Sequence, residues 1–227
     1  MFMEQFFRFL LLPACMISCC CSHKADDLPE PVISNRLSFS ENPANNWEVG
    51  YTTDHSLDAS KFQLDKFADT SFIVGMWHPG AGQSGYYPYI GQNRDSVTRT
   101  DMSNSWALRP GEIGMEGGNN GEYSMLRFKV PHAGRYRIKA IFEGVHFRLS
   151  STDVHVLLNG QHLFDDLIDG YGGDPAFHAI VGAHPAATFQ DTILLQKGDL
   201  LVFAIGYGSN GTFYNDTTGL LISIEMV

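Results

Sequence analysis

The sequence predicts an all-β protein in which residues 47–227 form one antiparallel, jelly-roll-like β-sandwich domain. Three observations lead to this prediction. Apolar and polar side chains alternate along several short segments after residue 122, as in strands with one buried face. Glycine, proline, asparagine and aspartate separate these segments, and helical periodicity is almost absent after residue 46. Short strands without crossover helices pair antiparallel, which favours a sandwich.

The alternation is clearest in the second half of the chain. Leu126, Phe128 and Val130 share one face of their segment, and Asn159-Gly160 favours a type I′ hairpin because both central positions of that turn need positive φ. Seven segments are expected as strands: 124–130, 135–142, 153–158, 161–164, 188–195, 200–206 and 220–227.

The first half gives weaker patterns. Residues 57–68 fit one or two helical turns, and a strand from Phe62 to Phe67 fits equally well. Residues 75–111 are rich in glycine and proline, so we interpret them as one or two long loops.

The composition is that of an acidic globular domain. Hydrophobic residues make up 44% and charged residues 18%, which excludes a disordered chain. The formal net charge of −10 argues against nucleic acid as a partner, and against contact of the domain itself with anionic lipid. All four cysteines precede residue 22, so the domain contains no disulfide framework, thiolate metal site or cysteine nucleophile.

The N-terminus has the features of an export signal. An apolar run extends from Phe6 to Ile17 and is interrupted by Arg8 and Pro13. It is too short to span a bilayer, which takes about 20 apolar residues, but it has the length of a signal-peptide core.

This run ends in the sequence ISCCC, which resembles a bacterial lipobox. We expect residues 1–18 to be the signal peptide and Cys19 to carry the lipid, with Cys20 and Cys21 as alternatives; an ordinary cysteine-rich secretory signal is the other interpretation. Residues 19–46 would then be a proline-containing tether. The expected location is the cell envelope, as an outer-membrane lipoprotein, and an acidic pair after the cysteines favours surface exposure.

Several strings in the chain follow one another in a familiar order: NGEYS before a strand, VPHAGRYRI, STDVHVLLNGQHLF, DGYG and KGDLLVFAIGYGSNGTFYNDTTGLLISI. Together they resemble a β-sandwich domain of secreted bacterial proteins, including proteins with PEP-CTERM sorting tails and modular carbohydrate-degrading proteins. The likeness covers about Trp47 to Val227. In such domains a His-Pro-Gly precedes the NGEYS segment, whereas Gly114-Met115-Glu116-Gly117 stands here. The resemblance implies a domain shaped like a carbohydrate-binding module, without a ligand contact from that histidine.

Polar side chains of the expected strands form the first candidate site. If Val154 and Val156 face the core, Asp153 and His155 share the opposite face. Basic residues of other strands, Arg127 among them, would also face outward. Such a face can bind a sugar or a carboxylate, and the alternative is a solvated face with paired charges.

Aromatic side chains between residues 75 and 111 form the second candidate. We expect Trp77, Tyr87 and Trp106 in loops, where rings can stack on the apolar faces of sugars. The alternative is that these rings pack beneath their own loops.

The polar loop at 207–219 is the third candidate. Asn215 and Asp216 offer oxygen ligands for Ca²⁺, although a site would need a further carboxylate such as Asp153 or Asp169. The alternative is a loop that satisfies its own polar groups through turns. No other cofactor is expected.

A glycan or polysaccharide is the expected partner, bound by a lipoprotein that touches the membrane only through its lipid anchor. One alternative is a glycan-degrading enzyme, a glycoside hydrolase or lyase, on the same scaffold. The other is a structural or assembly lipoprotein of the envelope. No spacing marks a pair of catalytic carboxylates, and neither a G-x-S-x-G elbow nor a helical zinc motif is present, so the sequence leans against an enzyme.

Overall fold

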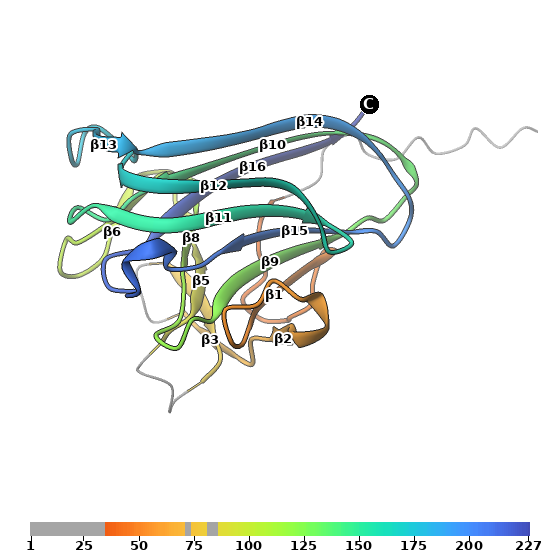
Figure 1. Cartoon of the computed structure of the whole chain (residues 1–227), viewed down its shortest axis with the longest axis horizontal. Coiled ribbons are helices and arrows are strands. Elements are labelled where there is room, and N and C mark those ends of the chain that lie inside the picture. Colours follow the sequence, from red (N-terminus) through yellow and green to blue (C-terminus); the bar gives the residue numbers. More distant parts are fainter. Residues whose placement is uncertain (1–34, 71–73, 81–85) are drawn as a thin grey trace, which may run out of the picture.

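The computed structural model describes residues 35–70, 74–80 and 86–227, and it consists of two antiparallel seven-stranded sheets packed as a sandwich (Figure 1). The first sheet has the strand order β13-β12-β11-β15-β9-β1-β2, and the second has the order β14-β10-β16-β8-β5-β4-β3. The short strands β6 and β7 pair separately. The prediction of a single all-β sandwich domain is confirmed.

The first sheet contains β1 (Trp47–Thr52), β2 (Gln63–Leu64), β9 (Tyr123–Lys129), β11 (Ser150–Leu158), β12 (Gln161–Tyr171), β13 (Val181–His184) and β15 (Leu200–Ile205). The second contains β3 (Phe67–Asp69), β4 (Gly75–His78), β5 (Tyr89–Gln92), β8 (Ile113–Glu116), β10 (Gly134–Gly144), β14 (Ala186–Leu195) and β16 (Thr218–Met226). The remaining elements are β6 (Arg99–Thr100), β7 (Ala107–Leu108) and the 3₁₀ turns η1 (Ala59–Lys61) and η2 (Gly208–Asn210).

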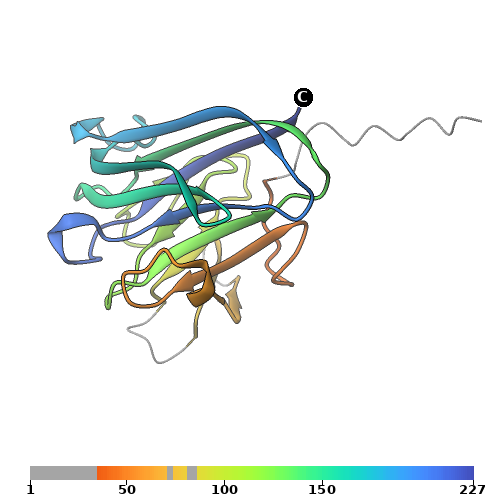
Figure 2. The same ribbon diagram turned by 45° about the vertical axis from the view of Figure 1, so that its right-hand side comes forward.

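The two sheets face each other (Figure 2). Buried side chains from the facing strands of both sheets form the main core. Leu126 and Val156 reach it from the first sheet, and Ile138, Phe142 and Ile222 reach it from the second. The alternation seen in the sequence is what places these side chains on the inner faces, because successive residues of a strand point to opposite sides.

Two sequence-based interpretations of the first half need correction. The segment 75–111, expected as loops, contains β4, β5, β6 and β7. Every residue of β5 and β8 is buried. These strands have no exposed face, so their sequences lack the polar and apolar alternation that marks a half-buried strand. The segment 57–68 contains the single 3₁₀ turn η1, the two-residue strand β2 and the start of β3, rather than a longer helix or one strand.

Residues 35–46, which the sequence analysis assigns to the tether, pack against the sandwich. Leu37 is buried in the main core, and its backbone N–H donates to Oε1 of Gln92 at 2.9 Å. Residues 1–34, and with them Cys19 and the expected signal peptide, lie outside the described part of the chain. Among the described residues no helix is long and apolar enough to cross a membrane.

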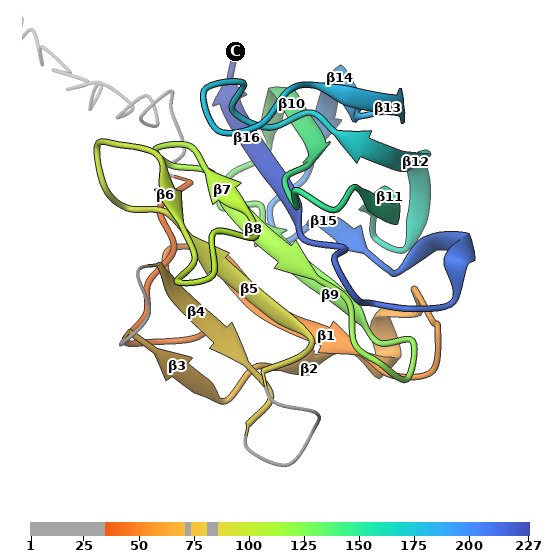
Figure 3. The ribbon, with the colours of Figure 1, turned by 90° about the vertical axis from the view of Figure 1, so that its left-hand side faces the viewer.

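One end of the sandwich carries the loop 206–217, which joins β15 to β16. This loop is blue in Figure 1 and lies at the end that faces the viewer in Figure 3. The turn between β8 and β9 lies at the same end. Two of the regions described below contact this loop: the polar network around Asp153 and the aromatic cluster around Tyr87.

Candidate functional site

The outer face of the first sheet brings Asp153 and His155 together, as the alternation along β11 predicts. Nε2 of His155 lies 2.8 Å from Oδ2 of Asp153. Nδ1 of the same ring lies 2.5 Å from Oδ1 of Asp165, which is opposite His155 on β12. With a carboxylate at each nitrogen, the ring must donate at both positions, so the geometry favours an imidazolium held between two aspartates.

Tyr123 and the loop 206–217 hold Asp153 in place. The hydroxyl of Tyr123 donates to Oδ2 of Asp153 at 2.6 Å, and the backbone N–H of Gly208 donates to Oδ1 at 2.8 Å. Tyr123 reaches Asp153 across the end of β15, where Gly206 has no side chain. A Cβ at Gly206 would lie only 2.5 Å from Oδ1 of Asp153 and 2.7 Å from the Tyr123 ring. The glycine therefore makes this cross-strand hydrogen bond sterically possible.

Burial and hydrogen bonding act in opposite directions on this network. Burial alone would raise the pKa of Asp153, but hydrogen bonds from His155, Tyr123 and Gly208 lower it to about 2. Burial would likewise lower the pKa of His155, and its bonds to Asp153 and Asp165 raise it instead. The result is a compact ion network on an otherwise acidic protein.

Sequence reasoning missed Asp165, Tyr123 and the nearby His162. Nδ1 of His162 also lies 2.7 Å from Oδ1 of Asp165. Cross-strand register decides the contacts of Asp165 with His155 and of Tyr123 with Asp153, and an irregularity within β12 decides the contact of His162 with Asp165. Neither can be read from a single segment.

Arg127 faces outward on β9, as expected, but belongs to a different neighbourhood. Its Nε lies 3.1 Å from a carboxylate oxygen of Glu48, and its guanidinium carbon lies 4.1 Å from the centre of the Phe62 ring. A small apolar cluster on the outer face, formed by Met125, Leu157, Val202 and Ala204 and covered by Leu57 and Phe62, adjoins it. The structure therefore does not place Arg127 in the Asp153–His155 network.

The two tryptophans predicted to bind sugar lie in packed environments. Trp77, in β4, is 5% exposed, and its indole N–H donates to the carbonyl of Ser38 at 2.7 Å. Trp106 is half-buried and packs against Val74, Leu108 and Val145. The structure does not bring these two rings into one exposed platform.

Tyr87 lies in an aromatic cluster that the loop 206–217 completes. Its ring centre is 4.7 Å from that of Phe213, and Phe213 is stacked with Tyr214 at 4.4 Å and an interplanar angle of 29°. Tyr214 is 67% exposed, whereas Phe213 is buried. Burial and the nearby charges of Glu116 and Asp101 raise the pKa of Tyr87. We call Tyr87, Phe213 and Tyr214 the tyrosine platform.

The two residues expected to bind a cation occupy different environments. Asp216 is buried, and its Oδ1 accepts a hydrogen bond from the backbone N–H of Ser151 at 2.8 Å. Burial raises the pKa of Asp216 to about 7. Asn215 is half-buried with a φ of 68°, the left-handed conformation that asparagine tolerates in turns. These contacts fix the loop. Among the described residues, Asp216 does not lie in a cluster of three or more His, Cys, Asp or Glu side chains at metal-ligand spacing.

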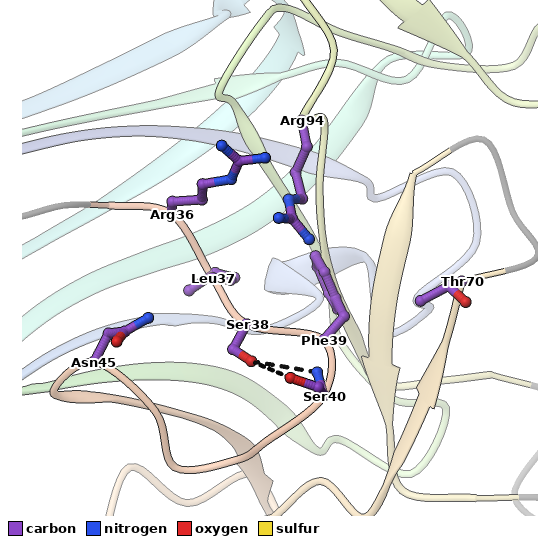
Figure 4. Close-up of a pocket in the computed structure, with 8 residues that line it drawn as sticks. All are labelled: Arg36, Leu37, Ser38, Phe39, Ser40, Asn45, Thr70 and Arg94. Carbon is purple, nitrogen blue, oxygen red and sulfur yellow. Dashed lines mark hydrogen bonds between the residues drawn. The ribbon is translucent and has the colours of Figure 1, made fainter.

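A separate surface pocket of about 410 Å³ lies near the first described residues (Figure 4). Arg36 and Arg94 line it together with serine and threonine hydroxyls, and the Arg94 guanidinium lies 5.9 Å from the centre of the Phe39 ring. No residue singled out from the sequence lines this pocket.

No family model and no curated protein matches the chain. Among solved structures, it is similar to the CBM35 from Cellvibrio japonicus Abf62 (10% identity, 61% of this chain and 92% of that one, TM-score 0.32). It is also similar to a family 35 carbohydrate-binding module from Clostridium thermocellum (11%, 67% and 87%, 0.30). A third similarity, to the β-glucosidase from Kluyveromyces marxianus in complex with glucose (9%, 87% of this chain, 0.32), spans 17% of that enzyme. At these TM-scores the similarities assign neither a family nor a ligand.

Proposed function

We propose that the domain binds glycan at the end of the sandwich that carries the loop 206–217. The observation that carries this proposal is the tyrosine platform. Tyr214 presents an exposed ring, and the stack on Phe213 holds it from below. A flat aromatic ring that is supported on one side and open to solvent on the other suits the apolar face of a pyranose.

Polar groups of the same loop support the proposal, because sugar hydroxyls need hydrogen-bond partners beside the stacked ring. Ser209 and Asn210 are exposed in η2, and Asn215 follows Tyr214 directly. The loop is tied to the sheet through Gly208 and Asp216, so these partners are held on a fixed backbone. A prearranged site loses less conformational entropy when it binds.

A glycan array followed by calorimetry on the bound oligosaccharide tests this function. Tyr214→Ala is expected to weaken binding at least tenfold, because it removes the stacking surface while Phe213 remains in place. Phe67→Ala is the matched control, since Phe67 is also an exposed aromatic (51%) but lies on β3, an edge strand of the second sheet, outside the loop 206–217. Both variants should keep the stability of the parent chain to within about 1 kcal/mol.

Two results would contradict the proposal. One is the absence of glycan binding across the array, and the other is binding that Tyr214→Ala leaves unchanged. Release of new reducing ends or unsaturated products from a bound glycan would instead identify the enzymatic alternative.

We further propose that a lipid on Cys19 holds this domain at the cell envelope. The ISCCC sequence after the apolar run supports this location. Metabolic labelling with a radioactive fatty acid is expected to mark the chain. Cys19→Ala should abolish the label, and a label that Cys19→Ala leaves unchanged would exclude this anchoring cysteine.

A further inference from the structure

A β-bulge places His162 on the same face as Asp165. Side chains three residues apart on a regular strand point to opposite faces. In the β11–β12 pair, Val156 lies opposite Phe164 and Leu157 lies opposite His162, so Leu163 is an extra residue on β12. The bulge shifts the alternation by one residue and brings His162 to the outer face, where Asp165 and His155 already lie. Bulges commonly re-aim a side chain in this way beside functional sites.

The three side chains offer ligand atoms at close range. Nδ1 of His155 and Nδ1 of His162 lie 2.5 Å and 2.7 Å from Oδ1 of Asp165, and all three candidate atoms lie within 4.8 Å of one another. The ligands of a tetrahedral ion with bonds of about 2.0–2.2 Å are about 3.3 Å apart. Each histidine nitrogen therefore has to move away from the Asp165 oxygen by under about 1 Å. The two histidine nitrogens, which lie within 4.8 Å of each other, approach by at most about 1.5 Å, and side-chain rotation can supply both changes.

A second observation points independently to a ligand at this position. Metal-binding histidines usually donate their other ring N–H to a carboxylate, which fixes the tautomer and the ring orientation. Nε2 of His155 has such a partner in Asp153, and Tyr123 and the Gly208 backbone hold that carboxylate in turn. Nδ1 of His155 is thereby aimed at the space that it shares with Asp165 and His162. A bound ion would take the place of the proton that Nδ1 otherwise donates to Asp165, and that proton would be released to solvent.

We propose that His155, His162 and Asp165 form a binding site for one divalent first-row transition ion, with Zn²⁺ as the representative. Two imidazole nitrogens and one carboxylate oxygen suit Zn²⁺ and its neighbours in the row better than Ca²⁺ or Mg²⁺, which prefer all-oxygen ligands. The side chains of His162 and Asp165 are 47% and 50% exposed, so water or another small ligand can complete the coordination. This site differs from the Asn215–Asp216 position suggested by the sequence, and it does not depend on glycan binding at the tyrosine platform.

Calorimetric titration of Zn²⁺ into the full chain, after dialysis against a chelator, tests the site. One saturable site is expected. His162→Ala and Asp165→Asn should each weaken Zn²⁺ binding at least tenfold. Asp153 is not a ligand in this site but orients His155, so Asp153→Asn should weaken Zn²⁺ binding about 10–100-fold. His184→Ala is the control, because His184 is an exposed histidine on the adjacent strand β13 and should leave the affinity unchanged.

The imidazole NMR signals of His155 and His162 provide a readout that does not require a variant to fold. Both are expected to shift on addition of one equivalent of Zn²⁺, and the signals of His184 should stay in place. Failure to saturate with Zn²⁺, or an affinity that survives both His162→Ala and Asp165→Asn, would overturn the proposal. A loss of Zn²⁺ binding in His162→Ala should leave glycan binding intact, so the two proposals can fail separately.

Discussion

At the scale of single residues, Gly206 shows how a missing side chain organises a polar network. Tyr123 and Asp153 lie on strands separated by β15, and their hydrogen bond passes over the position where a Cβ would stand. Asp153 then serves as acceptor for Tyr123, His155 and Gly208 at once. One glycine thus decides whether the sheet face and the loop 206–217 share this carboxylate.

Gly206→Ala is expected to lower the free energy of unfolding by about 1–3 kcal/mol, because the added methyl group forces Tyr123 and Asp153 apart in a packed site. Urea denaturation measures this change. Tyr207→Phe is the matched control: it removes only the hydroxyl that lies 2.7 Å from Nε2 of the exposed His55, and it should cost a few tenths of a kcal/mol, about the effect of a surface substitution. If Gly206→Ala lowers the free energy of unfolding by no more than Tyr207→Phe does, the hydrogen bond between Tyr123 and Asp153 does not depend on the missing side chain at Gly206.

At the scale of elements, the β11–β12 hairpin has a turn that can be predicted from the sequence and a bulge that cannot. Asn159 and Gly160 have φ values of 52° and 82°, as the type I′ prediction requires. The bulge at Leu163 carries no comparable mark, because nothing in QHLFDD separates an irregular strand from a regular one. The hairpin and the Asp153–His155 face were therefore predictable, whereas the approach of His162 and Asp165 was not.

Gly160→Ala is expected to destabilise the domain by about 1–2 kcal/mol, since a side chain other than asparagine or aspartate strains the left-handed conformation. Gly160→Asn provides the control at the same position, because asparagine tolerates positive φ and should lose clearly less. The comparison uses thermal or urea unfolding of both variants. Equal losses would mean that the backbone conformation of the turn is not what Gly160 contributes.

At the scale of the whole molecule, the long strands follow from the sequence and the short ones do not. β9, β10 and β11 have one face toward the core, so their alternation identifies them. β5 and β8 are buried on both faces and are only four residues long, which leaves no period of two to detect. For the same reason the sequence predicts a loop around Trp77, which lies in the mostly buried strand β4. The exposed ring of Tyr214 becomes a candidate only through its position on Phe213.

Buried carboxyl groups give the fold a characteristic pH dependence. Burial raises the pKa of Glu116 and of Asp65 to about 8, and that of Glu112 to about 7. Between about pH 4 and pH 8 these three groups bind more protons in the folded chain than in the unfolded chain, so their contribution to stability falls as pH rises through this window. The buried His146, whose pKa burial lowers to about 4, opposes this trend only in the acidic part of the window. Asp153, with its lowered pKa, acts only below the window, where its contribution is lost as pH falls toward 2.

Urea denaturation at several pH values checks this expectation. Stability should decline from pH 5 to pH 8, and Glu116→Gln should make the decline shallower because it removes one buried ionisable group. The exposed Asp191→Asn is the control and should leave the slope unchanged. A stability that is constant or rises across this range would contradict the assignment of protonated buried acids.

The central claim is that the tyrosine platform and its loop bind glycan. Backbone amide NMR mapping with an oligosaccharide from the array tests it most directly, because it locates the contact without any substitution. The largest shifts are expected at residues 86–89 and 206–217. Shifts confined to the second sheet, for example to β10 and β14, would contradict the claim if the signals of Tyr87 and Tyr214 stay unmoved at saturation.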